Sequence, residues 1–175
     1  MVKHLSLLST RAENLRDSFQ SKGNLRNLQA LAEITNSYII SGMDYSFLLQ
    51  LNGFSKDDVT YVLKQLGVEV PIVTSFSNST TIVVQSTTLH SHSPLSDKVE
   101  NLKQCYHEKQ KFVHLKILGD IVRSYTISNE CDTTLILRNC FAKRFVQKVL
   151  LQLNIENYQP IVFPATQTIA LQLKR

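Results

Sequence analysis

The sequence predicts an α+β protein made of two tandem copies of one unit, each with three to four helices followed by a β-hairpin. Three observations lead to this fold class. The chain matches itself when it is shifted by 87 positions, which is typical of an internal duplication. Each copy carries apolar residues at helical spacing and then changes to strand-like sequence before it ends.

The repeat is continuous over most of each copy. Residues 9–69 align with residues 96–156 without a gap, and about 22 of the 61 aligned pairs are identical. The identical pairs include Ser37-Tyr38, which recurs as Ser124-Tyr125. An accidental match would supply only a handful of identities, so we predict two copies of one fold.

The boundaries of the copies follow from the alignment and from composition. We place the first repeat at residues 1–86 and the second at residues 96–175. Residues 87–95 between them are rich in Ser, Thr and His and contain a Pro, which is typical of a linker.

Each copy is expected to begin with a helix, at Thr10–Gln20 and at Asp97–Glu108. A longer helix follows, because four apolar residues recur at helical spacing in both copies. These residues are Leu28, Leu31, Ile34 and Tyr38 in the first copy and Leu115, Leu118, Ile121 and Tyr125 in the second. A short helix is then predicted near Tyr45–Leu51 and near Thr133–Asn139.

The last helix of each copy has the clearest apolar stripe. Its members are Val59, Val62, Leu63 and Leu66, repeated as Val146, Val149, Leu150 and Leu153. Ser55 is suited to cap the start of the first of these helices. Gly67 and Asn154 stand where a helix commonly ends in a left-handed residue. The β-branched sequence that follows each helix predicts a β-hairpin.

The segments YSFLLQLNGFSKDDVTYVLKQLGVE and TTLILRNCFAKRFVQKVLLQLNIE, each with its hairpin, resemble the winged-helix family in element order and hydrophobic spacing. The resemblance implies two tandem winged-helix-like domains. In that family the third helix enters the DNA major groove and the hairpin touches the DNA backbone, but the same fold also docks proteins. Residues, and not the fold, must therefore decide the function.

The excess positive charge lies in the second copy. Residues 1–87 carry 7 Lys and Arg against 7 Asp and Glu, whereas residues 88–175 carry 12 against 7. On and just before the last helix, the apolar stripe leaves a basic and polar set facing outward: Arg138, Lys143, Arg144, Gln147, Lys148 and Gln152. Such side chains suit phosphates and base edges. We predict that the second copy binds nucleic acid, most simply duplex DNA, as a transcriptional regulator does.

An alternative is a protein adaptor or assembly subunit. The first copy carries Asp57, Asp58 and Tyr61 on the matching face, and its carboxylates repel phosphate, so this copy is expected to dock a protein or the twin subunit of a homodimer. The second copy carries Phe145 and Leu151 at positions outside the stripe, so either the two copies pack on each other there, which we expect, or another molecule does. A third interpretation, an ordinary solvated surface, also stays open for the basic set.

No motif indicates catalysis, a cofactor or a metal. Cys105, His107 and His114 do not form a four-ligand set, and the sequence contains no P-loop and no nucleophile elbow. We therefore predict a non-enzymatic protein. Glu13 is interpreted as a surface residue.

The cellular context is inferred from what the sequence lacks. No apolar run approaches the roughly 18 residues that a membrane span needs. The N-terminus has no secretory pattern, and the three cysteines form no C-x-x-C pair. We expect a cytoplasmic or nuclear protein with reduced thiols and no membrane association.

Overall fold

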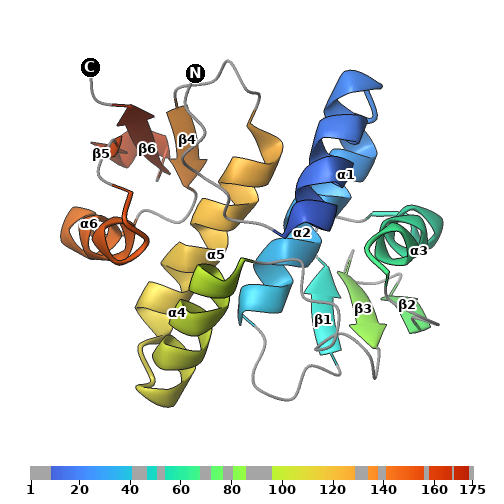
Figure 1. The fold of residues 1–175 in the computed structure, drawn as a ribbon, viewed down its shortest axis with the longest axis horizontal. Helices are drawn as coiled ribbons and strands as arrows, with labels where there is room; N and C mark the ends of the chain where they lie inside the picture. Colours follow the sequence, from blue (N-terminus) through green and yellow to red (C-terminus); the bar gives the residue numbers. More distant parts are fainter. Residues whose placement is uncertain are drawn as a thin grey trace.

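The computed structural model describes residues 9–40, 47–50, 54–67, 72–76, 81–85, 96–128, 134–137, 141–155, 158–166 and 168–173. Within these ranges the chain is an α+β protein whose two halves have the same order of elements, α-α-β-α-β-β (Figure 1). The predicted linker lies outside the described residues. None of the described helices combines the length and the apolar character required to cross a membrane.

The helices fall at equivalent positions of the two copies. The first copy contains α1 (Thr10–Ser21), α2 (Leu25–Ile40) and α3 (Lys56–Gln65). The second contains α4 (Asp97–Glu108), α5 (Phe112–Ile127) and α6 (Lys143–Gln152), each starting 87 residues after its counterpart. The leading, long and last helices predicted for each copy are thus confirmed.

The prediction of a short helix between the second and third helices of each copy is wrong. Those segments contain the strands β1 (Phe47–Gln50) and β4 (Thr134–Leu137). Each strand contains a run of only three apolar residues, which is too short for its periodicity to distinguish a helix from a strand. In each copy the last strand of the hairpin that follows has one edge not used by the hairpin. The apolar run becomes a strand because it pairs with that edge.

Each copy therefore has a three-stranded antiparallel sheet. The hairpins are β2 (Ile72–Phe76) with β3 (Thr81–Gln85), and β5 (Tyr158–Phe163) with β6 (Thr168–Leu173), a 3₁₀ turn at Pro164–Thr166 lying in the second. The strand orders are β1-β3-β2 and β4-β6-β5, so the last strand of each copy is central. The predicted hairpins are confirmed, and Pro160 in β5 occupies an edge strand, where a proline is tolerated.

The ends of the last helices follow the capping rules. The Ser55 hydroxyl accepts a hydrogen bond from the backbone N–H of Asp58 at 3.1 Å. Gly67 and Asn154 both have positive φ, at 88° and 60°. After α6, the N–H of Ile155 donates to the carbonyl of Leu150 at 2.8 Å, which closes a Schellman turn.

The predicted apolar stripes form the core. The residues of the α3 and α6 stripes are at most 5% exposed, and so are those of the long helices with the exception of half-buried Tyr125. Periodicity therefore identified the buried face of four helices, because a stripe at helical spacing can be removed from water only on one side of the helix.

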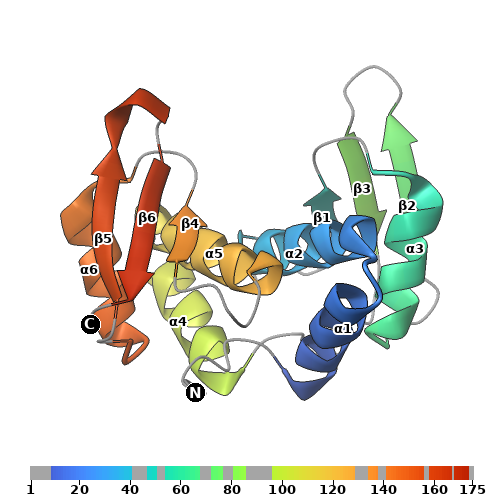
Figure 2. The same ribbon diagram turned by 90° about the horizontal axis from the view of Figure 1, so that it is seen from above.

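The two copies pack on each other through α2 and α5, which lie side by side in the middle of the molecule (Figures 1 and 2). Both views place α3 and α6 at opposite ends. The expectation that the copies meet at Phe145 and Leu151 is therefore wrong. Both residues belong to α6, which packs on α5 and β5 of its own copy.

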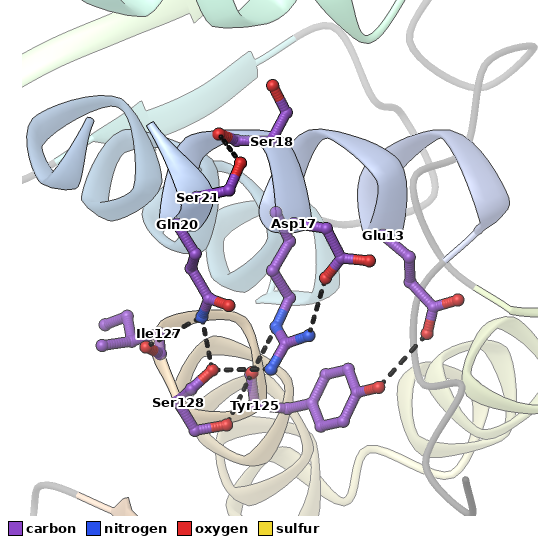
Figure 3. Close-up of polar contacts among 9 residues, drawn as sticks. Glu13, Asp17, Ser18, Gln20, Ser21, Tyr125, Ile127 and Ser128 are labelled. Carbon is purple, nitrogen blue, oxygen red and sulfur yellow. Dashed lines mark hydrogen bonds and ion pairs between the residues drawn. The ribbon is translucent and has the colours of Figure 1, made fainter. Parts of the chain in front are cut away.

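A polar contact between the copies reinforces this packing. Arg16 on α1 is 6% exposed and donates to the carbonyl oxygens of Tyr125 and Ser128, at 3.0 and 2.6 Å. Gln20 donates to the same Ser128 carbonyl, and the Tyr125 hydroxyl donates to the Glu13 carboxylate at 3.3 Å (Figure 3). Glu13 is thus a contact residue between the copies and not a free surface residue. The two carbonyl groups that accept the Arg16 and Gln20 bonds lie at the C-terminal end of α5.

Candidate nucleic-acid interface

The outward face of α6 is basic. The helix buries Val146, Val149 and Leu150 and has no Asp or Glu in its sequence KRFVQKVLLQ. Five of the predicted binding residues are exposed on this helix: Lys143, Arg144, Gln147, Lys148 and Gln152. The apolar stripe is what orients them, because burying it on α5 turns the remaining positions toward solvent.

The start of α6 lacks the features that neutralise a helix N-terminus. Its N-cap is Ala142, which has no side chain to accept a hydrogen bond, and its first turn contains no acidic residue. The equivalent helix α3 is capped by Ser55 and carries Asp57 and Asp58 in its first turn. The positive end of the α6 dipole therefore adds to the charge of Lys143 and Arg144, whereas that of α3 is compensated.

A lysine at the start of α5 extends the positive charge beyond α6. Lys111 is the N-cap residue of α5, and Lys111 and Lys148 both act on the imidazole of His114. Burial is the largest cause that lowers the pKa of His114, followed by the positive charges of these two lysines. We define the basic surface as Lys111, Lys143, Arg144 and Lys148.

Lys111 was not among the residues predicted from sequence. An alignment of the two copies could have identified it, because Lys111 aligns with the uncharged Asn24 of the first copy and is therefore part of the extra positive charge of the second. Only the packing of α5 against α6 lets Lys111 and Lys148 act on the same imidazole, that of His114.

The ring of His114 lies in an aromatic cluster beneath the basic surface. Its centroid is 5.6 Å from that of Tyr106 and 5.4 Å from that of Phe145, the latter pair meeting edge to face. Phe145 is accordingly half-buried within its own copy. The structure places it under the α6 surface as support, a role that its alignment with Asp58 did not suggest.

The matching face of the first copy is electrically balanced. Arg26 at the start of α2 pairs with Asp58 on α3, with 2.7 Å between nitrogen and oxygen. The equivalent positions in the second copy are Val113 and Phe145, which are uncharged. The α3 sequence KDDVTYVLKQ contains equal numbers of acidic and basic residues, so the difference in charge between the copies is concentrated at this helix.

The other predicted residues have different placements. Gln152, although exposed, accepts a hydrogen bond from the hydroxyl of buried Tyr106, so its side-chain oxygen is engaged within the protein. Arg138 lies outside the described residues. Of the residues predicted for a protein interface, Leu151 is 61% exposed, Tyr61 is 49% exposed, and Asp57 is also exposed.

Within the described ranges, no group of three or more His, Cys, Asp or Glu residues is arranged to hold a metal ion. Cys105 is a free, half-buried thiol, and Cys131 and Cys140 lie outside those ranges. No family model, curated protein or solved structure matches this chain.

Proposed function

We propose that this protein is a non-enzymatic nucleic-acid-binding protein, and that its second copy contacts duplex DNA through the basic surface. The observation that carries the proposal is the unbalanced positive charge of α6. Three cations and an uncapped helix N-terminus share the start and outward face of this helix, while the equivalent helix of the first copy is balanced. Phosphates are the natural counter-charge for such a surface, because Lys and Arg pair with them and helix N–H groups donate to them.

The fold proposed for each copy is winged-helix-like. Support comes from the three-stranded antiparallel sheet and from the hairpin that packs beside α6 through β5. In this proposal α6 is the helix presented to DNA. The segment before α6 is the strand β4, so this helix is not preceded by the short helix that the resemblance implies.

The test is a fluorescence anisotropy titration of labelled duplex DNA at several salt concentrations. The wild-type protein is compared with the Arg144→Glu/Lys148→Glu double variant. Each phosphate contact contributes roughly 0.9 to the slope of log affinity against log salt. Loss of two contacts should lower that slope by about 2 and weaken binding at low salt.

The first copy supplies a matched control. Lys56→Glu/Lys64→Glu makes the same change in net charge on α3, where both lysines are exposed. If the α6 surface binds DNA, this control variant should keep its salt dependence. An equal loss of binding in both variants would mean that net charge alone is responsible, and no binding by the wild type at low salt would refute the proposal.

An alternative function, a protein adaptor, is favoured by a separate observation. Leu151 on α6 and Phe163 at the end of β5 are 61% and 49% exposed, and α6 and β5 pack together. Large apolar side chains are costly to leave in water and are common at interface centres. Binding to a protein through these residues would be lost in Leu151→Ser and would depend little on salt, which distinguishes it from DNA binding.

A further inference from the structure

The contact between α2 and α5 is closest at Gly119. A Cβ atom added to this glycine would overlap the side-chain oxygen Oδ1 of Asn36 on α2. The next nearest atoms, the Asn36 carbonyl oxygen and Cγ1 of Ile40, would both be at 3.5 Å, an ordinary contact distance. A residue larger than glycine at position 119 would therefore require the Asn36 side chain to move.

The duplication shows what the first copy offers at the same position. The residue equivalent to Gly119 is Ala32, which is fully buried on α2. If the α2 of another first copy took the place of α5, the Ala32 methyl group would occupy the space that Asn36 requires. An overlap of this kind forces a side chain or a helix to move, which in a packed interior is destabilising.

The buried charges also disfavour the pairing of two α2 faces. Glu33 lies one helical turn before Asn36 and is 9% exposed. The α5 face brings a buried cation, Arg123, whose Nε lies 3.4 Å from the Asp120 carboxylate. A second α2 face would bring another Glu33 in place of Asp120 and an uncharged Asn36 in place of Arg123, so this contact would keep two carboxylates but lose the Arg123 cation.

We propose that the α2 face is a selective pairing surface whose partner is the unlike copy. It accepts the glycine-bearing face of α5 and rejects a second α2 face, so the two copies close on each other within one chain. The pairing is sufficient to hold the copies together without the segment that joins them. This proposal is independent of nucleic-acid binding.

The experiment uses the full-length chain with a specific protease site placed within residues 87–95. The chain is folded, checked by circular dichroism, cut, and analysed by light scattering during size-exclusion chromatography over a dilution series. Three variants are compared with the parent: Gly119→Ala, Asn36→Ala, and the double variant that combines them. Gly119→Ala gives α5 the residue that α2 has at this position.

The cut parent should remain a one-to-one pair, and Asn36→Ala should behave like it. Gly119→Ala should raise the dissociation constant of the cut halves by roughly tenfold or more. The double variant should restore pairing, because without Oδ1 the new methyl group meets only ordinary contacts. Rescue of folding by the double variant, if Gly119→Ala alone does not fold, would support the proposal equally.

Three results would overturn the proposal. The cut parent could separate into halves at concentrations where the uncut chain is folded. Gly119→Ala could pair as tightly as the parent. Failure of the double variant to recover either folding or pairing would show that Gly119 is required for a reason other than Asn36.

Discussion

Arg16 and Lys103 are equivalent residues of the two copies, and each places its cation over a tyrosine of the other copy. The Arg16 guanidinium carbon is 4.8 Å from the centroid of the Tyr125 ring, and the Lys103 ammonium nitrogen is 4.5 Å from that of Tyr38. The two tyrosines are also equivalent to each other. The contact between the copies is therefore reciprocal, and a cation over an aromatic face is attractive in both halves of it.

Arg16→Met should destabilise the protein. The variant keeps the apolar stem but removes the hydrogen bonds that the guanidinium donates to the carbonyls of Tyr125 and Ser128, and a hydrogen bond to a charged group is worth about 1.5–3 kcal/mol. Urea denaturation measures the change in the free energy of unfolding. Arg144→Met is the matched control, because Arg144 also lies over a ring, that of Phe145 at 4.9 Å, but is exposed. An equal effect in both variants would contradict the importance of the Arg16 hydrogen bonds.

Lys103→Met should raise stability at pH 7, because the cost of burying the cation outweighs its attraction to the Tyr38 ring. Burial is the main cause that lowers the pKa of Lys103 from 10.5 to about 8, and the nearby Glu100 carboxylate opposes it. The charged form is therefore disfavoured in the folded state, at a cost on the order of a few kcal/mol.

The pH dependence of the Lys103→Met effect follows from the same shift. Between pH 8 and 10.5 the unfolded wild type binds more protons than the folded wild type, so wild-type stability rises with pH and the advantage of the variant shrinks. The comparison should stop near pH 10, the ordinary pKa of tyrosine. Burial raises the pKa values of Tyr106 and Tyr125 to about 12, so the stability of the folded protein falls above pH 10 for a separate reason. A difference between the proteins that stays constant from pH 7 to pH 10 would contradict this account.

Ala142→Ser should stabilise α6. Ala142 has φ −63° and ψ 131°, close to the −70° and 146° of Ser55, which caps the equivalent helix. A serine hydroxyl in this conformation accepts a hydrogen bond from an N–H of the first turn, which is worth about 1 kcal/mol. The reverse change, Ser55→Ala, should cost α3 a similar amount. Thermal unfolding measures both, and a destabilising Ala142→Ser would show that the α6 N-terminus differs from that of α3 in backbone geometry.

Gln152→Ala should affect stability and leave DNA binding unchanged. The Gln152 side chain accepts the hydroxyl hydrogen bond of Tyr106, and its loss leaves that buried donor without its partner at a cost of about 1 kcal/mol or more. Lys148→Ala should weaken DNA binding and leave stability unchanged, because its exposed side chain makes no bond on which the fold depends. Parallel denaturation and anisotropy titrations check both variants. Loss of DNA affinity in Gln152→Ala would return this residue to the binding surface.

The sequence predicted the parts of the fold that depend on local pattern. Helical spacing predicted the buried stripes that contain Leu31 and Val62 and their repeats. Capping preferences predicted that Ser55 caps α3 and that Gly67 and Asn154 are left-handed. It failed at β1 and β4, because a short apolar run becomes a strand only when another strand pairs with it. For the site, it identified the outward residues of α6 but missed Lys111, which acts on His114 together with Lys148 only because α5 and α6 pack against each other.

The sequence alone determined that this protein has two copies of one unit, which faces of its helices are apolar, and that the second copy carries the excess positive charge. These properties are local, since each depends on residue types at short spacing. Only the tertiary structure decided that the copies meet through α2 and α5 and that Arg16 and Lys103 lie over the tyrosines of the opposite copy. Such contacts depend on how two surfaces fit, and an atom as small as the Cβ missing from Gly119 takes part in that fit.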